Sequence, residues 1–304
     1  MSTAGLAKRF GAVTAVAGID LRIPRGVVCG FVGPNGAGKT TTIRMLLGLV
    51  RPSAGTGAVL GTPLSNPAGY LQRVGALIEG PAFYPTLSGK ANLRTLARLG
   101  GIDAGRIDGL LEQVGLKGRG GDQFRTYSLG MKQRLGIAAA LLPGPDLLVL
   151  DEPANGLDPG GIVEIRRLLR SLADSGITIF VSSHLLAEIE QICDHLVMIN
   201  QGRIAFQGPV SGLTAAQEHE IVARAERPDD AAALVALVTQ AGRSARLVGS
   251  DVHVAGDGSW AGPLNRLAME AGITLVHLSE QKPSLEDAFF RMVHEPNEPA
   301  EGAR

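Results

Sequence analysis

The sequence has little cysteine, no excess of either charge and no long apolar run. Its 304 residues include 2 cysteines, Cys29 and Cys193, which supply neither a disulfide framework nor a metal-ligand spacing. Both lie in apolar stretches, so we expect buried, reduced thiols, as suits a cytosolic protein. The 29 basic and 29 acidic residues cancel, so no basic excess draws the chain to nucleic acid or to an anionic membrane surface.

No segment is apolar over the length that a membrane span requires. The most apolar region, residues 135–150, is interrupted by Pro143-Gly144-Pro145-Asp146, whereas a span needs about 20 continuous apolar residues. No apolar signal core follows Lys8 and Arg9 near the N-terminus. We therefore expect any role at a membrane to work through a partner. The hydrophobic content of 45% suits one large domain or two.

One glycine-rich stretch organises the chain, namely Gly33-Pro34-Asn35-Gly36-Ala37-Gly38-Lys39-Thr40-Thr41. It fits the phosphate-binding pattern G-x-x-x-x-G-K-[ST]. The apolar residues 27–32 before it predict a buried strand, and residues 42–49 after it have the apolar spacing of a helix. The pattern requires this order of strand, glycine turn and helix, which favours a phosphate site over a chance glycine turn.

The chemistry expected of the loop follows from its residue types. Glycine lets the backbone adopt positive φ and come close to a ligand, and successive N–H groups then point into one anion-binding concavity. The helix that begins near Lys39 adds its positive dipole end. We expect Lys39 to reach the β- and γ-phosphates of a nucleotide, and the Thr40 hydroxyl to ligate Mg²⁺.

Two acidic residues end a second predicted strand. Residues 147–150 form a continuous apolar run, which is typical of a parallel strand covered on both faces. Asp151 and Glu152 follow at its carboxyl end, where parallel sheets form ligand crevices. We expect Asp151 to hold Mg²⁺ and Glu152 to orient or deprotonate the attacking water, the alternative being a solvated strand end.

Two further stretches are candidates for the same site. The apolar strand predicted over residues 177–181 leads to His184, which lies either at a crevice or merely exposed on the surface. Ser128 is placed to cap a helix that runs to residue 142, and Gly130 leaves backbone N–H groups accessible there. That helix start is a second potential anion site, although many helices begin this way.

The roles of Phe10 and Glu79 each have two interpretations. Phe10 either stacks on a base or packs as an ordinary aromatic, and residue type alone favours packing. Glu79 opens a loop rich in glycine and proline, residues 79–85, and is either a solvated acid or a carboxylate aimed at a metal.

The remaining pattern divides the chain near residues 208–216. Before that division we expect a short β region over residues 1–23, in which residues 19–23 alternate as a half-buried strand does. A strand at 75–78, helices at 88–98, 107–114 and 162–172, and a hairpin over 195–206 complete the expectation.

After the division the predicted order is strand, helix, two strands, helix, strand, which is the ferredoxin-like arrangement. These elements lie at 221–222, 228–240, 246–254, 260–271 and 273–277, and a terminal helix follows at 284–293. We expect domains at 1–215 and 216–294 and a disordered, Pro/Glu-rich tail at 295–304. Four histidines there have no metal-ligand spacing, and we expect them to be structural or exposed: His219, His253, His277 and His294.

A phosphate loop alone leaves GTPases, kinases and recombinase-type ATPases open, and the later motifs narrow the choice. Residues 128–133 resemble the signature of ATP-binding-cassette (ABC) ATPases, and residues 147–152 resemble their Walker B strand with its catalytic glutamate. Asn155-Gly156-Leu157-Asp158 resembles their D-loop. His184 falls at the position of their switch histidine, and Phe10 at that of their aromatic A-loop residue, which now favours stacking.

The resemblance covers about the first two-thirds of the chain and implies an α/β fold. That fold is the P-loop NTPase domain of ABC ATPases, with a RecA-like parallel sheet core, a β subdomain and a helical subdomain, joined here to a small α+β ferredoxin-like C-terminal domain. It also implies ATP and Mg²⁺ as ligands, with the metal held by Thr40, Glu79 and Asp151. Two copies are expected head to tail, so that Ser128, Gly130 and Asp158 complete the partner's nucleotide site.

The subfamily is indicated by two other stretches. Residues 78–85 with Asn92-Leu93 resemble the bacitracin and lantibiotic export and immunity ATPases, and residues 284–289 resemble the daunorubicin-resistance group. Both groups pair with a separate ABC-2 type membrane subunit. The resemblance implies an ATPase, peripheral on the inner face of the membrane, that powers export of a drug, antibiotic or peptide. Residues 79–92, with Phe83 and Tyr84 exposed, would contact the membrane subunit.

Departures and rivals qualify this expectation. Glu79 stands where the family usually has Gln, and Met131 departs from the usual signature. A non-transport ABC ATPase of the translation or repair type would carry two cassettes or a long coiled-coil insertion, and neither feature is present. The loop at Glu79 argues against an importer ATPase. Intact Asp151, Glu152 and His184 argue against a module that holds ATP without hydrolysing it.

Overall fold

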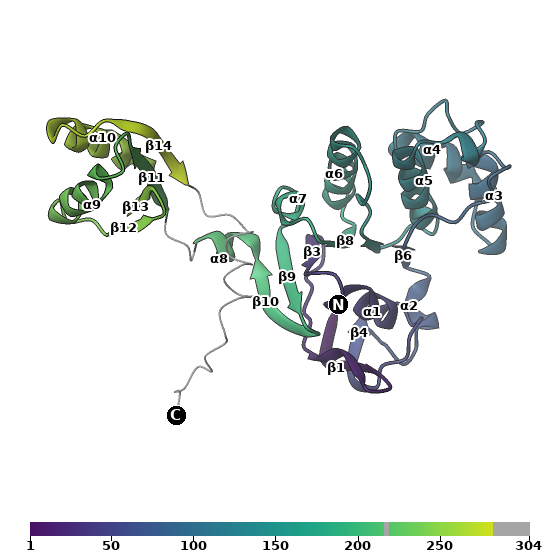
Figure 1. Ribbon diagram of the computed structural model, residues 1–304. Helices are drawn as coiled ribbons and strands as arrows, with labels where there is room; N and C mark the ends of the chain where they lie inside the picture. Colours follow the sequence, from purple (N-terminus) through teal and green to yellow (C-terminus); the bar gives the residue numbers. More distant parts are fainter. Residues whose placement is uncertain (216–218, 282–304) are drawn as a thin grey trace. The chain divides into compact units, whose positions relative to one another are not determined.

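The computed structural model describes residues 1–215 and 219–281, and the chain divides into two units, Met1–Val210 and Ser211–Arg304 (Figure 1). Each unit has its own buried apolar cluster. The division falls after Val210, whereas we expected it after residue 215. The predicted helix at 284–293, the tail at 295–304, His294 and the motif at 284–289 lie outside the described residues.

A six-stranded, mostly parallel sheet forms the centre of the first unit, in the order β10-β9-β3-β8-β7-β6. Neighbouring strands are parallel except for β10, which returns antiparallel to β9 as the predicted hairpin. The strands are β3 (Val28–Val32), β6 (Val74–Leu77), β7 (Leu147–Asp151), β8 (Thr178–Ser183), β9 (His195–Asn200) and β10 (Arg203–Pro209). Every residue of β3, β7 and β8 is buried, which explains their continuous apolar sequences.

Helices cover this sheet and fix the loops at its carboxyl edge. The helix α1 (Lys39–Leu46) contacts β7, and α6 (Pro159–Asp174) contacts β3 and β8. Two shorter helices are α7 (Leu186–Glu190) and α8 (Val210–Ala215). The helix α1 begins at Lys39, as expected for the dipole end of the loop, and Gly38 precedes it in a left-handed conformation.

A second, antiparallel sheet has the order β2-β1-β4-β5. Its strands are β1 (Ser2–Phe10), β2 (Val13–Ile19), β4 (Ala54–Val59) and β5 (Thr62–Pro63), and the short helix α2 (Ala68–Leu71) follows. Leu6, Val16 and Ile19 form a buried cluster with Met45 of α1, so this sheet packs beside the phosphate-loop helix. The strands β4 and β5 and the helix α2 were not predicted.

The expected strand over residues 19–23 is wrong as an element but right as a burial pattern. The strand β2 ends at Ile19, and beyond it only Arg22 forms an isolated bridge, to Ser2. Leu21 and Ile23 are nevertheless buried, while Asp20 and Arg22 are exposed. Backbone hydrogen bonds from the Thr3 N–H to Leu21 and from the Ile23 N–H to Met1 hold this segment beside the start of β1. An extended, paired segment alternates in burial as a strand does, even where the pairing is too short to be assigned as one.

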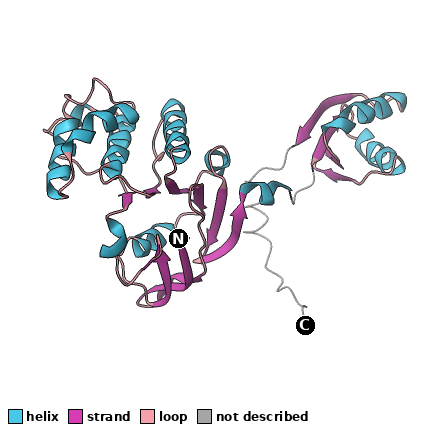
Figure 2. Ribbon diagram, turned by 180° about the vertical axis from the view of Figure 1, so that it is seen from behind, coloured by secondary structure: helices cyan, strands magenta, loops and turns pink. Residues whose placement is uncertain are grey.

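Three helices gather as a separate helical group in Figures 1 and 2. They are α3 (Gly89–Leu99), α4 (Ile107–Gln113) and α5 (Leu129–Leu141), and they contact one another. Two 3₁₀ turns, Ala104–Arg106 and Phe124–Thr126, join them. The parallel sheet, the β subdomain and the helical subdomain that the sequence predicted are therefore all present.

The second unit has the predicted order of strand, helix, two strands, helix and strand. Its elements are β11 (Glu220–Ala225), α9 (Asp230–Gln240), β12 (Ala245–Val248), β13 (Asp251–Ala255), α10 (Ala261–Glu270) and β14 (Leu275–Gln281). The sheet is antiparallel with the order β12-β13-β11-β14. Leu234 of α9 and Leu264 of α10 lie in its core cluster.

Cys29 and Cys193 are buried free thiols, and burial raises the pKa of both. Over residues 1–215 and 219–281, no three His, Cys, Asp or Glu side chains group as metal ligands. Within the same residues, none of the helices has the length and apolar character to cross a membrane.

Gly75 allows α5 to approach β6. A Cβ atom at Gly75 would lie 2.1 Å from the backbone oxygen of Ala140 in α5, which is a backbone clash that no rotamer relieves. We predict that Gly75→Ala lowers the free energy of unfolding by about 1–3 kcal/mol, measured by urea denaturation. Gly121→Ala is the matched control, because a Cβ there meets nothing within 4 Å; equal losses in both variants would contradict the packing argument.

Candidate functional site

The phosphate loop lies between β3 and α1, and its glycines are required for two different reasons. Gly36 has a backbone φ of 80° and Gly38 has one of 105°, and residues other than glycine rarely adopt such values. A Cβ at Gly33 would lie 2.2 Å from the backbone oxygen of Ile199, and one at Gly38 would lie 2.6 Å from that of Ala15. The loop can lie this close to β9 and β2 only because these positions have no side chain.

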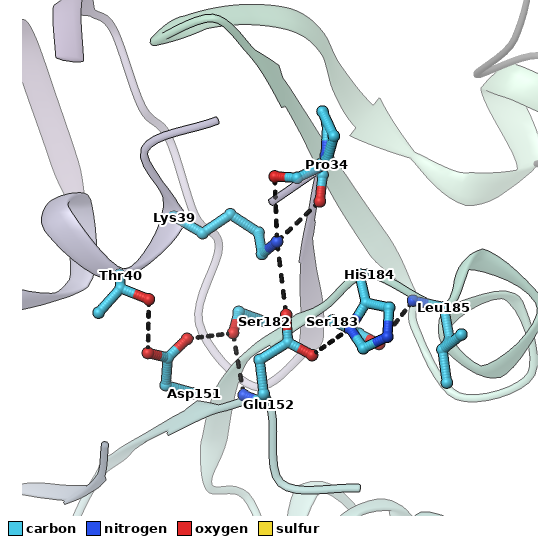
Figure 3. A network of polar contacts seen from close by, with 10 residues as sticks. Pro34, Lys39, Thr40, Asp151, Glu152, Ser182, Ser183, His184 and Leu185 are labelled. Atoms are coloured by element: carbon cyan, nitrogen blue, oxygen red, sulfur yellow. Dashed lines mark hydrogen bonds and ion pairs between the residues drawn. The ribbon is translucent and has the colours of Figure 1, made fainter. Parts of the chain in front are cut away.

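Lys39 turns back across this loop (Figure 3). Its Nζ donates hydrogen bonds to the backbone oxygens of Gly33 at 2.7 Å and Pro34 at 3.4 Å. The same Nζ lies 3.4 Å from Oε1 of Glu152, and the side chain is 6% exposed. The lysine charge therefore sits between the loop and the acid, where a phosphate group bound by the loop would meet it.

Asp151 is a buried carboxylate held from two sides. Thr40 Oγ1 donates to its Oδ2 at 2.8 Å, and Ser182 Oγ donates to its Oδ1 at 2.5 Å. The residue is 6% exposed, and a buried charge is tolerated only when its oxygens are hydrogen-bonded. The end of β7 is thereby tied to α1 on one side and to β8 on the other.

Glu152 follows in an unusual backbone conformation. Its φ is 51°, which is uncommon for a residue other than glycine and marks a position held by its surroundings. Its N–H donates to Ser182 Oγ at 3.0 Å and to the Ser182 carbonyl at 3.2 Å. Its Oε2 lies 2.7 Å from Nδ1 of His184. The carboxylate thus joins the lysine of the loop to the histidine that follows β8.

The structure brings together five predicted residues that are far apart in the sequence. Lys39 and Thr40 come from the start of α1, Asp151 and Glu152 from the end of β7, and His184 from the end of β8 (Figure 3). These elements meet because the carboxyl ends of parallel strands share one edge of a sheet. The arrangement presents a cation, two acids and a histidine around the mouth of an anion-binding loop.

The other predicted residues on α5 and α6 act as helix caps. Ser128 Oγ accepts a hydrogen bond from the N–H of Met131 at 3.2 Å, and Asp158 Oδ1 accepts one from Gly161 at 3.0 Å. Among the described residues, no hydrogen bond or ion pair joins Ser128, Gly130 or Asp158 to the Lys39–His184 cluster. Within one chain, these predicted nucleotide contacts therefore remain apart from the phosphate loop.

The signature and the D-loop nevertheless touch each other. A Cβ at Gly156 would lie 3.1 Å from Cδ2 of Leu129, and one at Gly130 would lie 3.8 Å from Cδ2 of Leu157. Leu129 is still 47% exposed, so this apolar contact leaves part of its surface open.

Phe10 lies at the end of β1 and is 51% exposed. Lys8 Nζ lies 4.9 Å from its ring centroid, within the range of a cation–π contact. The ring is therefore not an ordinary core aromatic, and its open surface suits stacking on a base.

Glu79 lies apart from Thr40 and Asp151. Its φ is 60°, and its carboxylate is hydrogen-bonded and ion-paired with Arg44 of α1. The side chain is 69% exposed, and an exposed ion pair contributes only about 0–1 kcal/mol. That pair is weak enough for Glu79 to exchange it for another partner.

The expectation that Phe83 is exposed is wrong. Phe83 is only partly exposed, and its ring packs edge-to-face on Phe124 at 5.1 Å between centroids. Tyr84 is 63% exposed, as expected. An aromatic pair of this kind stabilises the loop against the helical group.

The oxygen donors fit a magnesium ion that arrives with a triphosphate. Mg²⁺ prefers hard oxygen ligands, and it is usually held by one or two carboxylates together with substrate phosphates rather than by a cage of protein ligands. The Thr40 hydroxyl and the Asp151 carboxylate, 2.8 Å apart, are donors of this type.

Sequence reasoning missed Ser182 and Arg44. Ser182 lies near the end of β8 and is completely buried, and its hydroxyl contacts both Asp151 and Glu152. The signal was a hydroxyl residue at a buried strand end beside an acidic one, which asks for a hydrogen-bond partner. Nothing in the sequence marks Arg44 as the partner of Glu79.

Comparison with known proteins gives a consistent result. Residues 16–155 match the protein family described as ABC transporter. The chain is 40% identical over 298 residues to the bacitracin transport ATP-binding protein BcrA of Bacillus licheniformis, which covers 96% of this chain and 97% of that protein. It is also 40% identical over 207 residues to the lantibiotic transport ATP-binding protein SrtF of Streptococcus pyogenes, covering 68% and 90% of the two chains.

A solved structure supports the same fold. The structure of cbiO1 from Clostridium perfringens, described as part of the ABC transporter complex cbiONQ, superimposes with a TM-score of 0.65 at 26% identity. It covers 71% of this chain and 90% of that one.

Gly33 provides a test of the loop. We predict that Gly33→Ala weakens binding of a nucleoside triphosphate by about tenfold or more, equivalent to about 1.4 kcal/mol, because the added Cβ pushes the loop away from Ile199. Isothermal titration calorimetry measures this loss. Gly109→Ala, where a Cβ meets nothing within 4 Å, is expected to bind as the unaltered protein does; unchanged affinity in the Gly33 variant would contradict the predicted loop geometry.

Proposed function

The chain belongs to the ATP-binding subunits of ABC transporters, and from this premise we propose that its ATPase activity powers an exporter of a drug, antibiotic or peptide. The observation that carries the proposal is the 40% identity to a bacitracin transport subunit over nearly the full length of both chains. The match to a lantibiotic transport subunit supports the same class of cargo. The selectivity for a particular cargo would reside in a separate transmembrane subunit.

The phosphate loop and Lys39 bind the triphosphate of ATP. Backbone N–H groups of Gly36, Gly38 and the first turn of α1 face the phosphates, and Lys39 releases Glu152 to contact the β- and γ-phosphates. The half-exposed Phe10 ring stacks on the adenine base. Binding therefore replaces the 3.4 Å contact between Lys39 and Glu152 with a contact between Lys39 and phosphate.

Glu152 and His184 act on the hydrolytic water and on the γ-phosphate. Once free of Lys39, the Glu152 carboxylate orients and deprotonates the attacking water. His184 lies 2.7 Å from Glu152, so it can hold the γ-phosphate and keep the glutamate in place. Its Nδ1 then donates to the carboxylate, which leaves Nε2 toward the phosphate.

Thr40 and Asp151 would hold Mg²⁺ beside the phosphates, and Glu79 would join them after releasing Arg44. A bound Mg²⁺ supplies positive charge that neutralises the β- and γ-phosphate oxygens. Glu79 offers a hard oxygen where the family usually has an amide, at the expense of extra negative charge beside the triphosphate.

Two copies of the chain form the working ATPase. Among the described residues no hydrogen bond or ion pair joins Ser128 or Gly130 to the phosphate loop of the same chain, and we assign both, with Asp158, to the nucleotide site of a second copy arranged head to tail. Each nucleotide then joins two subunits, and hydrolysis releases them. The open surface of Leu129 at the start of α5 is consistent with a contact made between copies.

Residues 79–92 transmit this motion to an ABC-2 type membrane subunit. The side chains of Tyr84 and Leu87 are exposed apolar groups of this loop, and Glu79 lies at its start. The subunit would then be cytoplasmic and peripheral on the inner face of the membrane, held there by its partner.

Replacement of Glu152 tests the catalytic assignment. We predict that Glu152→Gln lowers the ATPase turnover number by about 100-fold or more, because an amide cannot accept the proton of water, while ATP binding persists. Phosphate release and nucleotide titration measure the two effects. Glu112→Gln, a surface residue paired with Lys117, is the control, and normal turnover in the Glu152 variant would contradict the assignment.

Dilution tests the two-copy site. We predict that ATPase activity per milligram falls as the protein is diluted below the dissociation constant of the ATP-bound dimer, because each site needs Ser128 of a second copy. Sedimentation velocity with Glu152→Gln and ATP measures the dimer directly. Constant specific activity at every dilution, with monomers throughout, would contradict the proposal.

A further inference from the structure

Ser182 occupies a position that links the two acids of the proposed site. It lies near the end of β8, opposite Asp151 in the register of β7 and β8. Its hydroxyl donates a hydrogen bond to Oδ1 of Asp151 at 2.5 Å, and the same oxygen accepts a hydrogen bond from the N–H of Glu152 at 3.0 Å (Figure 3). One buried hydroxyl therefore contacts the side chain of one acid and the backbone of the next.

The first of these contacts orients the Asp151 carboxylate. With Thr40 on Oδ2 and Ser182 on Oδ1, rotation of the carboxylate would break a charge-assisted hydrogen bond in a site that little water reaches. The oxygen that faces Thr40 is consequently kept toward the position proposed for the metal. Ser182 binds the carboxylate oxygen that faces away from Thr40, as a residue hydrogen-bonded to a metal ligand does.

The second contact holds the backbone of Glu152. A left-handed conformation costs free energy for a residue other than glycine and persists only where neighbours enforce it. The Glu152 N–H is shared between the hydroxyl and the carbonyl oxygen of Ser182. Because the carbonyl contact needs no side chain, loss of the hydroxyl loosens this turn without removing its last partner.

We propose that Ser182 is a positioning residue, which sets the metal-binding Asp151 and the general base Glu152 in one fixed geometry. This inference rests on the roles proposed above for those two acids. Ser182 is completely buried, and burying a hydroxyl is unfavourable unless it is hydrogen-bonded. The contacts to both acids explain why a serine stands there.

The test compares Ser182→Ala with Thr178→Val. Thr178 lies on the same strand, is also buried, and accepts a hydrogen bond from Gly26 at 2.9 Å, but it contacts neither acid. Both variants lose one buried hydroxyl. Thermal unfolding of each variant shows how much stability the lost hydroxyl contributes.

Three functional readouts separate positioning from stability. For Ser182→Ala we expect turnover to fall about 10- to 100-fold, and the Mg²⁺ concentration for half-maximal turnover to rise by a similar factor. We also expect ATP affinity measured in Mg²⁺ to weaken, while ATP affinity measured in EDTA stays unchanged. Thr178→Val is expected to retain all three values even where its unfolding temperature falls.

A second substitution keeps the test decisive. Ser182→Thr retains the hydroxyl and is expected to keep the Mg²⁺ requirement of the unaltered protein; if the alanine variant does not fold, Ser182→Cys, a weak donor, replaces it. An alanine or cysteine variant with normal turnover and a normal Mg²⁺ requirement would overturn the inference. So would a folded threonine variant with the same metal defect as alanine.

The two acids themselves separate this inference from the proposed function. Asp151→Asn and Glu152→Gln are measured alongside. If neither lowers turnover, the proposed catalytic site is wrong and the inference about Ser182 is wrong with it. If both lower turnover while Ser182→Ala does not, the site stands and only the role of Ser182 is rejected.

Discussion

The site of the first unit depends on one buried carboxylate. Asp151 is 6% exposed, and the hydroxyls of Thr40 and Ser182 satisfy its two oxygens. A buried charge without such partners would cost several kcal/mol, so the ends of β7, β8 and α1 must keep their relative positions for the unit to be stable. Stability and the geometry of the site are therefore enforced by the same contacts.

The Glu152 carboxylate next to this buried acid is paired on two sides. Glu152 is held between Lys39 and His184, so its charge is already compensated before any nucleotide binds. In the mechanism proposed above, a bound triphosphate would take Lys39 from the acid and free the base. Ser128 and Asp158 cap α5 and α6, and in the same proposal they serve the nucleotide site of a second copy.

Much of the fold was predictable, for reasons that individual elements make clear. The buried strands β3, β7 and β8 were found because continuous apolar runs between glycine-rich or polar turns are typical of parallel strands. The strands β4 and β5 were missed because residues 54–63 contain small and turn-forming residues with little period-two pattern. Phe83 was wrongly expected to be exposed, because its loop has the composition of a surface turn while its partner Phe124 lies far along the chain.

The available chemical groups and their order can be read from the residue pattern alone, since the phosphate loop, Asp151-Glu152 and His184 each carry a local pattern that reflects their chemistry. Which of these groups touch is seen only in the folded chain: Glu152 contacts Lys39 and His184, Glu79 contacts Arg44, and Ser182 contacts both acids. The physical reason is that hydrogen bonds and ion pairs act over about 3 Å, whereas the strands that bring these side chains within that distance are neighbours in the sheet and not in the chain.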